Sequence, residues 1–450
     1  MNPLKAFKKP AIRFITFFIT IIFLWQIVLA KTSDSLLNPY TKVQLENGLT
    51  LVVKEVHSAP IAAVDIWVGT GSINETPTEA GISHFFEHML FKGTTKRKVG
   101  EIAREIKAVG GYQNAATSLD TTHYYVVVPS EKVDLALDVE ADAIMNSTFE
   151  PAEIERERKV ILEERRLKEN SPNGKLGLLV YQTVFKGTPY ANDILGTADS
   201  LGNINQGTFL DYYHRYYRPN NMVVAVVGDV NTEKIISQVQ GLFRDFKAGD
   251  IPESAKFSIP VLKNITRVEA EMPVDQTYLY FAFPGPGINH PDEAALTMLS
   301  IILGDGQGSL LYQNMLEQKQ MVNEIAAGYQ TYHQIGLFAI YAQTSNTTIS
   351  TIETEIQKNI RRIINKGVSE ADLKRAKALM ESNIAYAMET NADIASIIGD
   401  YQLNGDLNDL DRFMKEFRKV SIKDLRRVAK KYLNPKAYVL AIVKPQEVAK

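Results

Sequence analysis

Residues 84–88 read His-Phe-Phe-Glu-His, and their types and spacing could bind a metal ion and activate water. They lie inside a helical pattern from about residue 79 to 91, so the two histidines project from one face of the helix, about one turn apart. Two imidazoles placed in this way suit one zinc ion. Glu87 can approach the same point without binding the metal, as a base for the attacking water must. Because this five-residue pattern is an established zinc signature, we predict that His84 and His88 are metal ligands and that Glu87 is the base.

The competing interpretation is a helix that merely carries three polar side chains on its surface. Phe85, Phe86 and Met89 surround them, however, and burying two histidines and a carboxylate without partners is costly. The chain has no cysteine, so any further ligand must be His, Asp or Glu. A catalytic zinc normally takes three protein ligands, and the third must come from elsewhere in the fold.

The segment from Pro151 to Lys168 is the best candidate for the third ligand, because it is a highly charged helix with a proline placed to start it. We expect its inner face to be formed by four apolar residues, Ile154, Val160, Ile161 and Leu167. Glu157 and Glu164 are two turns apart and are expected to share that face. Structural ion pairs are an alternative role for both glutamates, and the residue types alone do not reject it.

A family resemblance favours the metal role. Residues 84–88, followed by Glu-Arg-Lys-Val-Ile-Leu-Glu-Glu at 157–164, closely resemble the pitrilysin/insulinase family of zinc peptidases, which includes the mitochondrial processing peptidase. In that family the third ligand follows the second histidine by about the interval found here, 164 − 88 = 76 residues. The resemblance implies that Glu164 is the third ligand of one zinc ion per chain, and that Glu157 helps to orient the site.

The same resemblance extends to a strand that would bind substrate. Residues 110–117 read Gly-Gly-Tyr-Gln-Asn-Ala-Ala-Thr and look like the substrate-binding strand of the family. Such a strand can pair with an extended peptide through backbone hydrogen bonds, while pockets read the side chains of the peptide. The resemblance therefore implies that Asn114 and Ala115 bind substrate. An ordinary sheet strand is the alternative for any single residue there.

The positions of these residues depend on elements that the sequence also indicates. Asn47-Gly48 lies between alternating apolar residues and predicts a hairpin over residues 43–53. Further strands are expected at 62–68, 112–119, 122–129 and 222–227, with helices at about 79–91 and 101–109. Strands and helices that do not alternate regularly are typical of an α+β fold.

The two halves of the chain resemble each other at a constant offset. Residues 215–219, Arg-Tyr-Tyr-Arg-Pro, have a counterpart in Lys-Tyr-Leu-Asn-Pro at 431–435, and 435 − 219 = 216. The same offset places Trp67 to Gly71 over Phe283 to Gly287. Two matches at one offset predict a duplicated domain. We expect two homologous domains, each a mostly antiparallel sheet packed against helices, arranged as a clamshell. The first domain is predicted to cover residues 36–246 and to bind the metal. A linker at 247–260 is predicted to join it to the second domain, residues 261–450, which binds no metal.

The second half departs from the pattern of active single-chain family members. At the 216 offset the residues of the metal motif fall on Ser300, Leu303 and Gly304, so no second metal site is expected. Where such members have an Arg and a Tyr that support the substrate and its oxyanion, this chain has Glu317 and Glu324. Carboxylates cannot donate hydrogen bonds to an oxyanion. The resemblance therefore implies a partner, either a homologous metal-free subunit in a heterodimer or a second copy in a homodimer.

The first thirty residues have the layout of an export signal. Lys5, Lys8, Lys9 and Arg13 precede an uncharged run from Phe14 to Ala30. We expect a cleaved signal peptide, with an uncleaved membrane anchor as the alternative, and hence a periplasmic protein or one anchored to the inner membrane and facing the periplasm. The whole chain carries a formal net charge of −2. This charge supplies no broad basic surface, so nucleic acid is not an expected partner.

These observations together predict an exported zinc metalloendopeptidase that hydrolyses peptides or unfolded segments. The alternative is a non-catalytic assembly or scaffold subunit, related to the core proteins of respiratory complexes. The absent Arg and Tyr favour this alternative, whereas the intact motif at 84–88 counts against it, because a scaffold has no need of Glu87.

Overall fold

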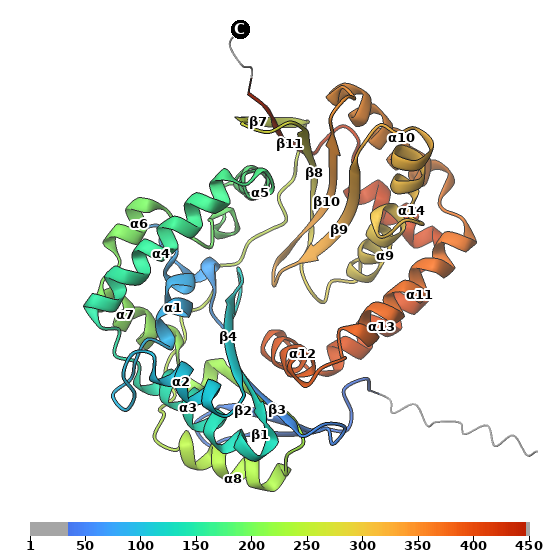
Figure 1. Cartoon of the computed structure of the whole chain (residues 1–450). Helices are drawn as coiled ribbons and strands as arrows, with labels where there is room; N and C mark the ends of the chain where they lie inside the picture. The colour runs from blue at the N-terminus through green and yellow to red at the C-terminus, as the bar shows by residue number, and fades with distance from the viewer. Residues whose placement is uncertain (1–34, 447–450) are drawn as a thin grey trace, which may run out of the picture.

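The computed structural model describes residues 35–446 as two units of sheet and helices that lie opposite each other (Figure 1). The predictions made for residues 1–30 lie outside the described residues. Within residues 35–446, no helix combines the length and apolar character needed to cross a membrane.

The first domain is built on a six-stranded sheet whose strand order is β1-β2-β6-β3-β5-β4. Its neighbouring strands run antiparallel except for the parallel pair β2 and β6. The strands are β1 (Thr41–Gln44), β2 (Thr50–Glu55), β3 (Ile61–Val68), β4 (Tyr112–Thr117), β5 (Thr122–Pro129) and β6 (Met222–Gly228). The helices are α1 (Ile82–Leu90), α2 (Glu101–Ala108), α3 (Val133–Asn146), α4 (Pro151–Asn170), α5 (Pro172–Val184), α6 (Ala198–Asn203), α7 (Gln206–Tyr216) and α8 (Thr232–Leu242).

The second domain repeats this plan with a five-stranded sheet in the order β7-β11-β8-β10-β9. Its strands are β7 (Thr266–Met272), β8 (Thr277–Pro286), β9 (Glu324–Thr331), β10 (Ile335–Thr344) and β11 (Val439–Pro445). Its helices are α9 (Glu293–Gly304), α10 (Ile349–Lys366), α11 (Glu370–Tyr386), α12 (Asn391–Asn404), α13 (Asn408–Lys419) and α14 (Ile422–Tyr432), with a π-helical segment at Tyr312–Gln318. The described chain has no helix or strand between residues 243 and 265.

The elements of the two domains correspond at the offset seen in the sequence. Strand β3 begins at Ile61 and β8 at Thr277, and 277 − 61 = 216. Helix α7 covers residues 206–216 and α14 covers 422–432, the same interval at both ends. The predicted α+β fold with two similar, mostly antiparallel sheet-and-helix domains is confirmed.

One helix of each domain packs on the sheet of the other domain. Helix α5 packs on β8 and β11 of the second sheet, and α12 packs on β3 and β6 of the first. This exchange explains why strand residues such as Leu51, Val52 and Val53 are all buried. Leu51 and Val53 belong to the core of the first domain, whereas Val52 packs in the core that includes α12. When a sheet is covered on both faces, its strands contain consecutive apolar residues instead of alternating apolar and polar ones.

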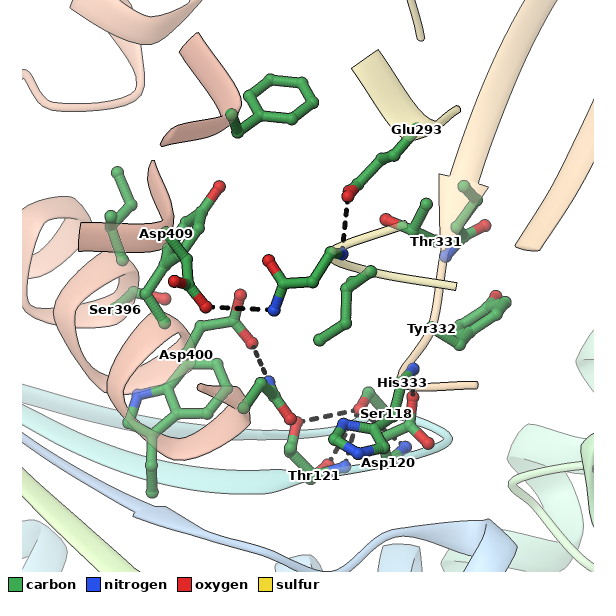
Figure 2. Close-up of a pocket in the computed structure, with 18 residues that line it drawn as sticks. Ser118, Asp120, Thr121, Glu293, Thr331, Tyr332, His333, Ser396, Asp400 and Asp409 are labelled. Carbon is green, nitrogen blue, oxygen red and sulfur yellow. Dashed lines mark hydrogen bonds between the residues drawn. The ribbon is translucent and has the colours of Figure 1, made fainter. Parts of the chain in front are cut away.

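The domains also meet at the tips of their corresponding hairpins. The backbone N–H of His333, between β9 and β10, donates a hydrogen bond of 2.8 Å to Asp120, between β4 and β5. The Tyr190 hydroxyl donates to the other oxygen of the same carboxylate at 2.8 Å. Beside this contact lies a cavity of about 440 Å³, which several carboxyl groups line (Figure 2). The three predicted metal ligands do not line it.

The prediction of which residues form the inner face of α4 was partly wrong. Ile154 and Ile161 are buried, but Val160 is 49% exposed and Leu167 58% exposed. Successive residues of a helix are about 100° apart, so Val160 and Ile161 cannot share one narrow face. Glu157 is buried with Ile161, and the exposed pair forms a separate stripe beside it.

Candidate metal centre

Helix α1, which carries the His-Phe-Phe-Glu-His motif, is fixed at its N-terminus by a buried carboxyl group. Glu75 accepts hydrogen bonds from the backbone N–H groups of Gly81 at 2.7 Å and Ser83 at 2.9 Å. These amides belong to the first turn of the helix, where backbone donors lack partners in the helix itself. Burial raises the pKa of Glu75 to about 8. The sequence analysis missed Glu75, although an acidic residue shortly before a glycine that starts a helix is a usable signal.

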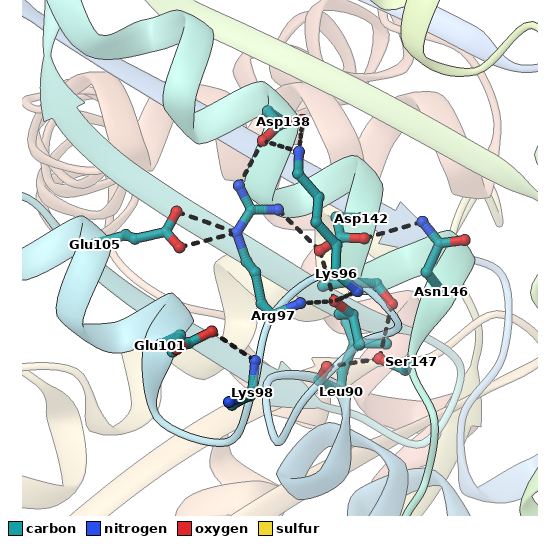
Figure 3. A network of polar contacts seen from close by, with 12 residues as sticks. Leu90, Lys96, Arg97, Lys98, Glu101, Glu105, Asp138, Asp142, Asn146 and Ser147 are labelled. Atoms are coloured by element: carbon teal, nitrogen blue, oxygen red, sulfur yellow. Dashed lines mark hydrogen bonds and ion pairs between the residues drawn. The ribbon is translucent and has the colours of Figure 1, made fainter.

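A polar network holds the other end of α1. The Ser147 hydroxyl donates a hydrogen bond of 2.7 Å to the carbonyl of Leu90, the last residue of α1. Nearby, Arg97 is buried and pairs with Asp142 at 2.8 Å and with Glu105 at 3.0 Å (Figure 3). These contacts tie the loop after α1 to α2 and α3. The helix that carries the motif is therefore anchored at both ends.

Apolar packing fixes which face of α1 turns toward α4. Phe85 and Phe86 are fully buried, and the ring of Phe86 stacks on Tyr217 with centroids 4.1 Å apart. With these residues turned into the core, His84 and His88 project toward Glu164 of α4.

Three side chains converge at this point. His84 Nε2 lies 3.7 Å and His88 Nε2 lies 3.6 Å from Glu164 Oε2. One ligand atom from each of the three residues lies within 4.8 Å of the others. Ligands about 2.1 Å from a tetrahedral ion are about 3.4 Å from one another, so the spacing fits one zinc ion. Within residues 35–446, no other group of three His, Cys, Asp or Glu side chains meets this test.

The electrostatics of the cluster suit a metal. Burial, together with the nearby His88 and Lys168, lowers the pKa of His84 to about 3. The His84 imidazole is therefore neutral at physiological pH and offers a lone pair, as a metal ligand must.

Glu157 lies behind the cluster and contacts one candidate ligand, His88. His88 Nδ1 lies 3.1 Å from Glu157 Oε2, and Lys92 Nζ lies 2.7 Å from the other oxygen. When Nδ1 of His88 carries the ring proton and donates it in a hydrogen bond to Glu157, Nε2 keeps a free lone pair. This lone pair faces Glu164. The structure thus brings Glu157 to the position predicted for a supporting residue.

Glu87 lies beside the three candidate ligands and contacts the predicted substrate strand. The Thr117 hydroxyl, at the end of β4, donates a hydrogen bond of 2.6 Å to the Glu87 carboxylate. Burial raises the pKa of Glu87, and the Thr117 hydrogen bond opposes this shift. A carboxyl group with a raised pKa is a more effective proton acceptor near neutral pH. The sequence analysis did not assign a role to Thr117.

The predicted substrate residues Asn114 and Ala115 lie on β4, the edge strand of the first sheet. Among the strands within residues 35–446, it pairs with β5 alone. Its outer edge therefore has backbone N–H and C=O groups available to an added strand. Asn114 is three residues from Thr117, or about 10 Å along the strand. Glu317 and Glu324 are exposed on the second domain, the former in the π-helical segment and the latter at the start of β9.

Comparison with known proteins places the chain in a family. Residues 50–198 match the model described as "Insulinase (Peptidase family M16)", and residues 203–380 match the "Peptidase M16 inactive domain". A Rickettsia felis protein named "Uncharacterized zinc protease" is 32% identical over 86% of this chain and 93% of its own length. The chain belongs to the insulinase family, peptidase family M16. The predicted family is therefore confirmed.

Other insulinase-family relatives cover nearly all of the chain. An Arabidopsis thaliana protein named "Probable mitochondrial-processing peptidase subunit beta, mitochondrial" is 30% identical over 99% of this chain and 85% of its own length. The crystal structure of a protease from Helicobacter pylori superposes with a TM-score of 0.85. It is 27% identical and covers 90% of this chain and 99% of the solved chain. The second domain of this insulinase-family chain matches a model described as inactive, and Ser300 and Leu303 are buried in α9 at the positions that correspond to His84 and Glu87.

Proposed function

We propose that this insulinase-family chain is a zinc-dependent endopeptidase that hydrolyses peptides or unfolded polypeptide segments. The observation that carries the proposal is the convergence of His84, His88 and Glu164 within 4.8 Å, with Glu87 beside them. When bound there, zinc supplies Lewis acidity, which polarises the scissile carbonyl and makes water at the site more acidic. Relatives named zinc proteases support the choice of metal. One ion per chain is proposed because residues 35–446 contain one group of three candidate ligands.

Glu87 supplies the acid–base chemistry. Its carboxylate takes a proton from the attacking water and then passes it to the nitrogen of the leaving amine. The hydrogen bond from Thr117 keeps the carboxylate directed at the site. Glu157 acts through His88, whose orientation it fixes, and does not contact the substrate.

The substrate binds as an extra strand along β4. Backbone pairing with the segment around Asn114 and Ala115 is insensitive to sequence, so extended and unfolded segments are the expected substrates. Thr117 ends this strand and contacts Glu87, so an added strand runs past the base.

A partner subunit completes the site. Glu317 and Glu324 occupy the positions at which active single-chain members would have an Arg and a Tyr, and their carboxylates cannot donate hydrogen bonds to an oxyanion. A homologous metal-free chain supplies these donors in a heterodimer; the alternative assembly is a homodimer. The Arabidopsis relative is itself named as a subunit, which supports an assembly of more than one chain.

We propose that the chain is exported and works in the periplasm, free or anchored to the inner membrane through residues 1–30. The basic and apolar composition of that segment supports this location. Nucleic acid is not a proposed partner, because the charge balance of −2 offers no broad basic surface.

Metal analysis separates this proposal from the scaffold alternative. The purified protein should contain about one zinc ion per chain, whereas a scaffold would contain no stoichiometric zinc. Peptide hydrolysis is then measured for the chain alone and after mixing with a metal-free homologue from the same genome. An increase on mixing supports the heterodimer, and full activity of the chain alone would dismiss it.

A further inference from the structure

A groove of about 430 Å³ lies between strands β4 and β5 of the first domain and helix α12 of the second. It opens on the face of the first sheet that turns away from α1. Tyr124 of β5 packs in the core that contains α1, whereas its neighbours line the groove, because successive residues of a strand point to opposite faces. The residues that matter to the chemistry of the groove are Asp65, Tyr112, His123, Tyr125, Asp393 and Ser396.

A substrate strand on β4 would place side chains over this groove. Thr117 turns its hydroxyl to Glu87, on the face of the sheet that α1 covers. Its neighbour Ala116 lines the groove, and so does Asn114, which shares the face of Ala116. A peptide that pairs with the edge of β4 continues the sheet, so its side chains alternate between the two faces. Every second side chain of the peptide therefore lies over the groove.

The imidazole of His123 is held rigidly in the wall of the groove. Its Nδ1 lies 3.0 Å from one oxygen of Asp65 and 3.2 Å from the other, and Asp65 is only 1% exposed. The ring stacks on Trp67 with centroids 4.2 Å apart and on Tyr125 with centroids 5.7 Å apart. A group fixed in this way loses little conformational freedom when a ligand binds, so its hydrogen bond contributes more to affinity.

Several polar groups of the groove are free to bind a ligand. Within residues 35–446, no hydrogen-bond partner contacts His123 Nε2 or the hydroxyls of Tyr112, Tyr125 and Ser396. A hydroxyl can donate or accept, and an imidazole nitrogen whose ring is protonated on the other side accepts. The groove therefore offers hydrogen-bond donors and acceptors together.

The charged groups of the groove already have partners. No lysine or arginine is among the described residues that line it. The carboxyl group of Asp65 is taken by His123, and Asp393 Oδ2 accepts hydrogen bonds from the backbone N–H of Thr390 at 3.2 Å and from its hydroxyl at 2.6 Å. A neutral polar side chain consequently fits the groove better than a charged one.

We propose that this groove binds an amide side chain, Asn or Gln, of the peptide substrate. The inference rests on the proposed function and adds a substrate class to it. An amide carries both donors and acceptors without a charge, which matches the free groups of the groove. A site built from such groups rejects an apolar side chain of the same shape, because its polar groups lose water and gain no partner.

The test uses the zinc-loaded full chain and a set of peptides in which each position in turn is Gln, Met, Glu or Lys. Met has nearly the shape of Gln but cannot replace its hydrogen bonds. The wild type should prefer Gln over Met at one position by about 10-fold in kcat/KM. A stronger preference for Lys or Glu at that position would show that the groove reads charge, and would overturn the proposal.

Variants of the groove should remove this preference. His123→Phe keeps the stacked ring and removes Nε2, and should reduce the ratio of Gln to Met at least about 5-fold. It also leaves Asp65 buried without its partner, so the protein can fail to fold. Tyr125→Phe combined with Ser396→Ala removes two hydroxyls with little change of shape and should have a similar effect. Tyr386→Phe combined with Ser382→Ala is the matched control, because both residues are exposed on α11.

A binding measurement separates the groove from the catalytic proposal. Glu87→Gln chains, with Tyr125 and Ser396 intact or both changed, are titrated with fluorescent Gln and Met peptides. The groove predicts tighter binding of the Gln peptide, lost in the changed chain. If that difference appears but no wild-type hydrolysis does, the catalytic proposal fails and the groove stands. Hydrolysis without any Gln preference, or a preference that the changes at Tyr125 and Ser396 leave intact, would overturn the groove.

Discussion

The Thr117 hydroxyl donates a hydrogen bond of 2.6 Å to the Glu87 carboxylate. Thr117 ends the edge strand β4, and Glu87 lies on α1 between the two histidines. This contact joins the segment that would hold an extended peptide to the group that would activate water. Under the proposed function, one side chain would therefore couple substrate binding to catalysis.

Thr117→Val should lower kcat about 10-fold to 100-fold with zinc retained, because a hydrogen bond to a charged group contributes about 1.5–3 kcal/mol. That hydrogen bond lowers the pKa of Glu87, so its loss raises the pKa, and the acid limb of the pH–rate profile should move to higher pH. Thr117→Ser retains the hydroxyl and should behave like the wild type. A valine variant with unchanged kcat and acid limb would show that the contact has no catalytic role.

Glu157→Gln should weaken zinc binding about 10-fold to 100-fold, because it removes the carboxylate that orients His88. Chelator competition measures the dissociation constant for zinc. Glu163→Gln is the control on the same helix, since Glu163 is exposed and pairs with Arg166 instead of with a residue of the centre. Equal zinc affinity in the two variants would contradict the role given to Glu157.

Gly399→Ala should destabilise the packing of α12 on the first domain. A Cβ at this position would lie 2.1 Å from Cδ1 of Trp67, and overpacking costs about 1–3 kcal/mol. Gly241→Ala, in open space on α8, should instead stabilise the protein by about 0.5–1 kcal/mol through helix propensity. Urea unfolding of the two variants compares them. A Gly399→Ala protein as stable as Gly241→Ala would mean that the two domains do not pack as described.

The structural features that depend on local sequence patterns could be predicted from the sequence. The hairpin at Asn47-Gly48 is present between β1 and β2, and the 216-residue repeat appears in the elements of both domains. The motif at 84–88 predicted that its two histidines project from one face of a helix, about one turn apart. Glu164 could be chosen only through the family resemblance, because the residue types did not distinguish a ligand from a partner in an ion pair.

Contacts between segments that are distant in the sequence could not be predicted from local sequence patterns. The bond from Thr117 to Glu87 depends on how β4 lies against α1, and the exchange of α5 and α12 depends on how the domains face each other. Val160 and Leu167 were assigned to the wrong face, because apolar residues of a charged helix do not by themselves show which stripe is covered.

The most direct measurement is the zinc content and peptidase activity of Glu87→Gln, made in the full chain and assayed with whatever partner the wild type requires. The substitution keeps the size of the side chain and removes its ability to accept a proton. The account predicts a variant that holds as much zinc as the wild type and hydrolyses peptides at least about 100-fold more slowly. Hydrolysis at the wild-type rate would contradict it.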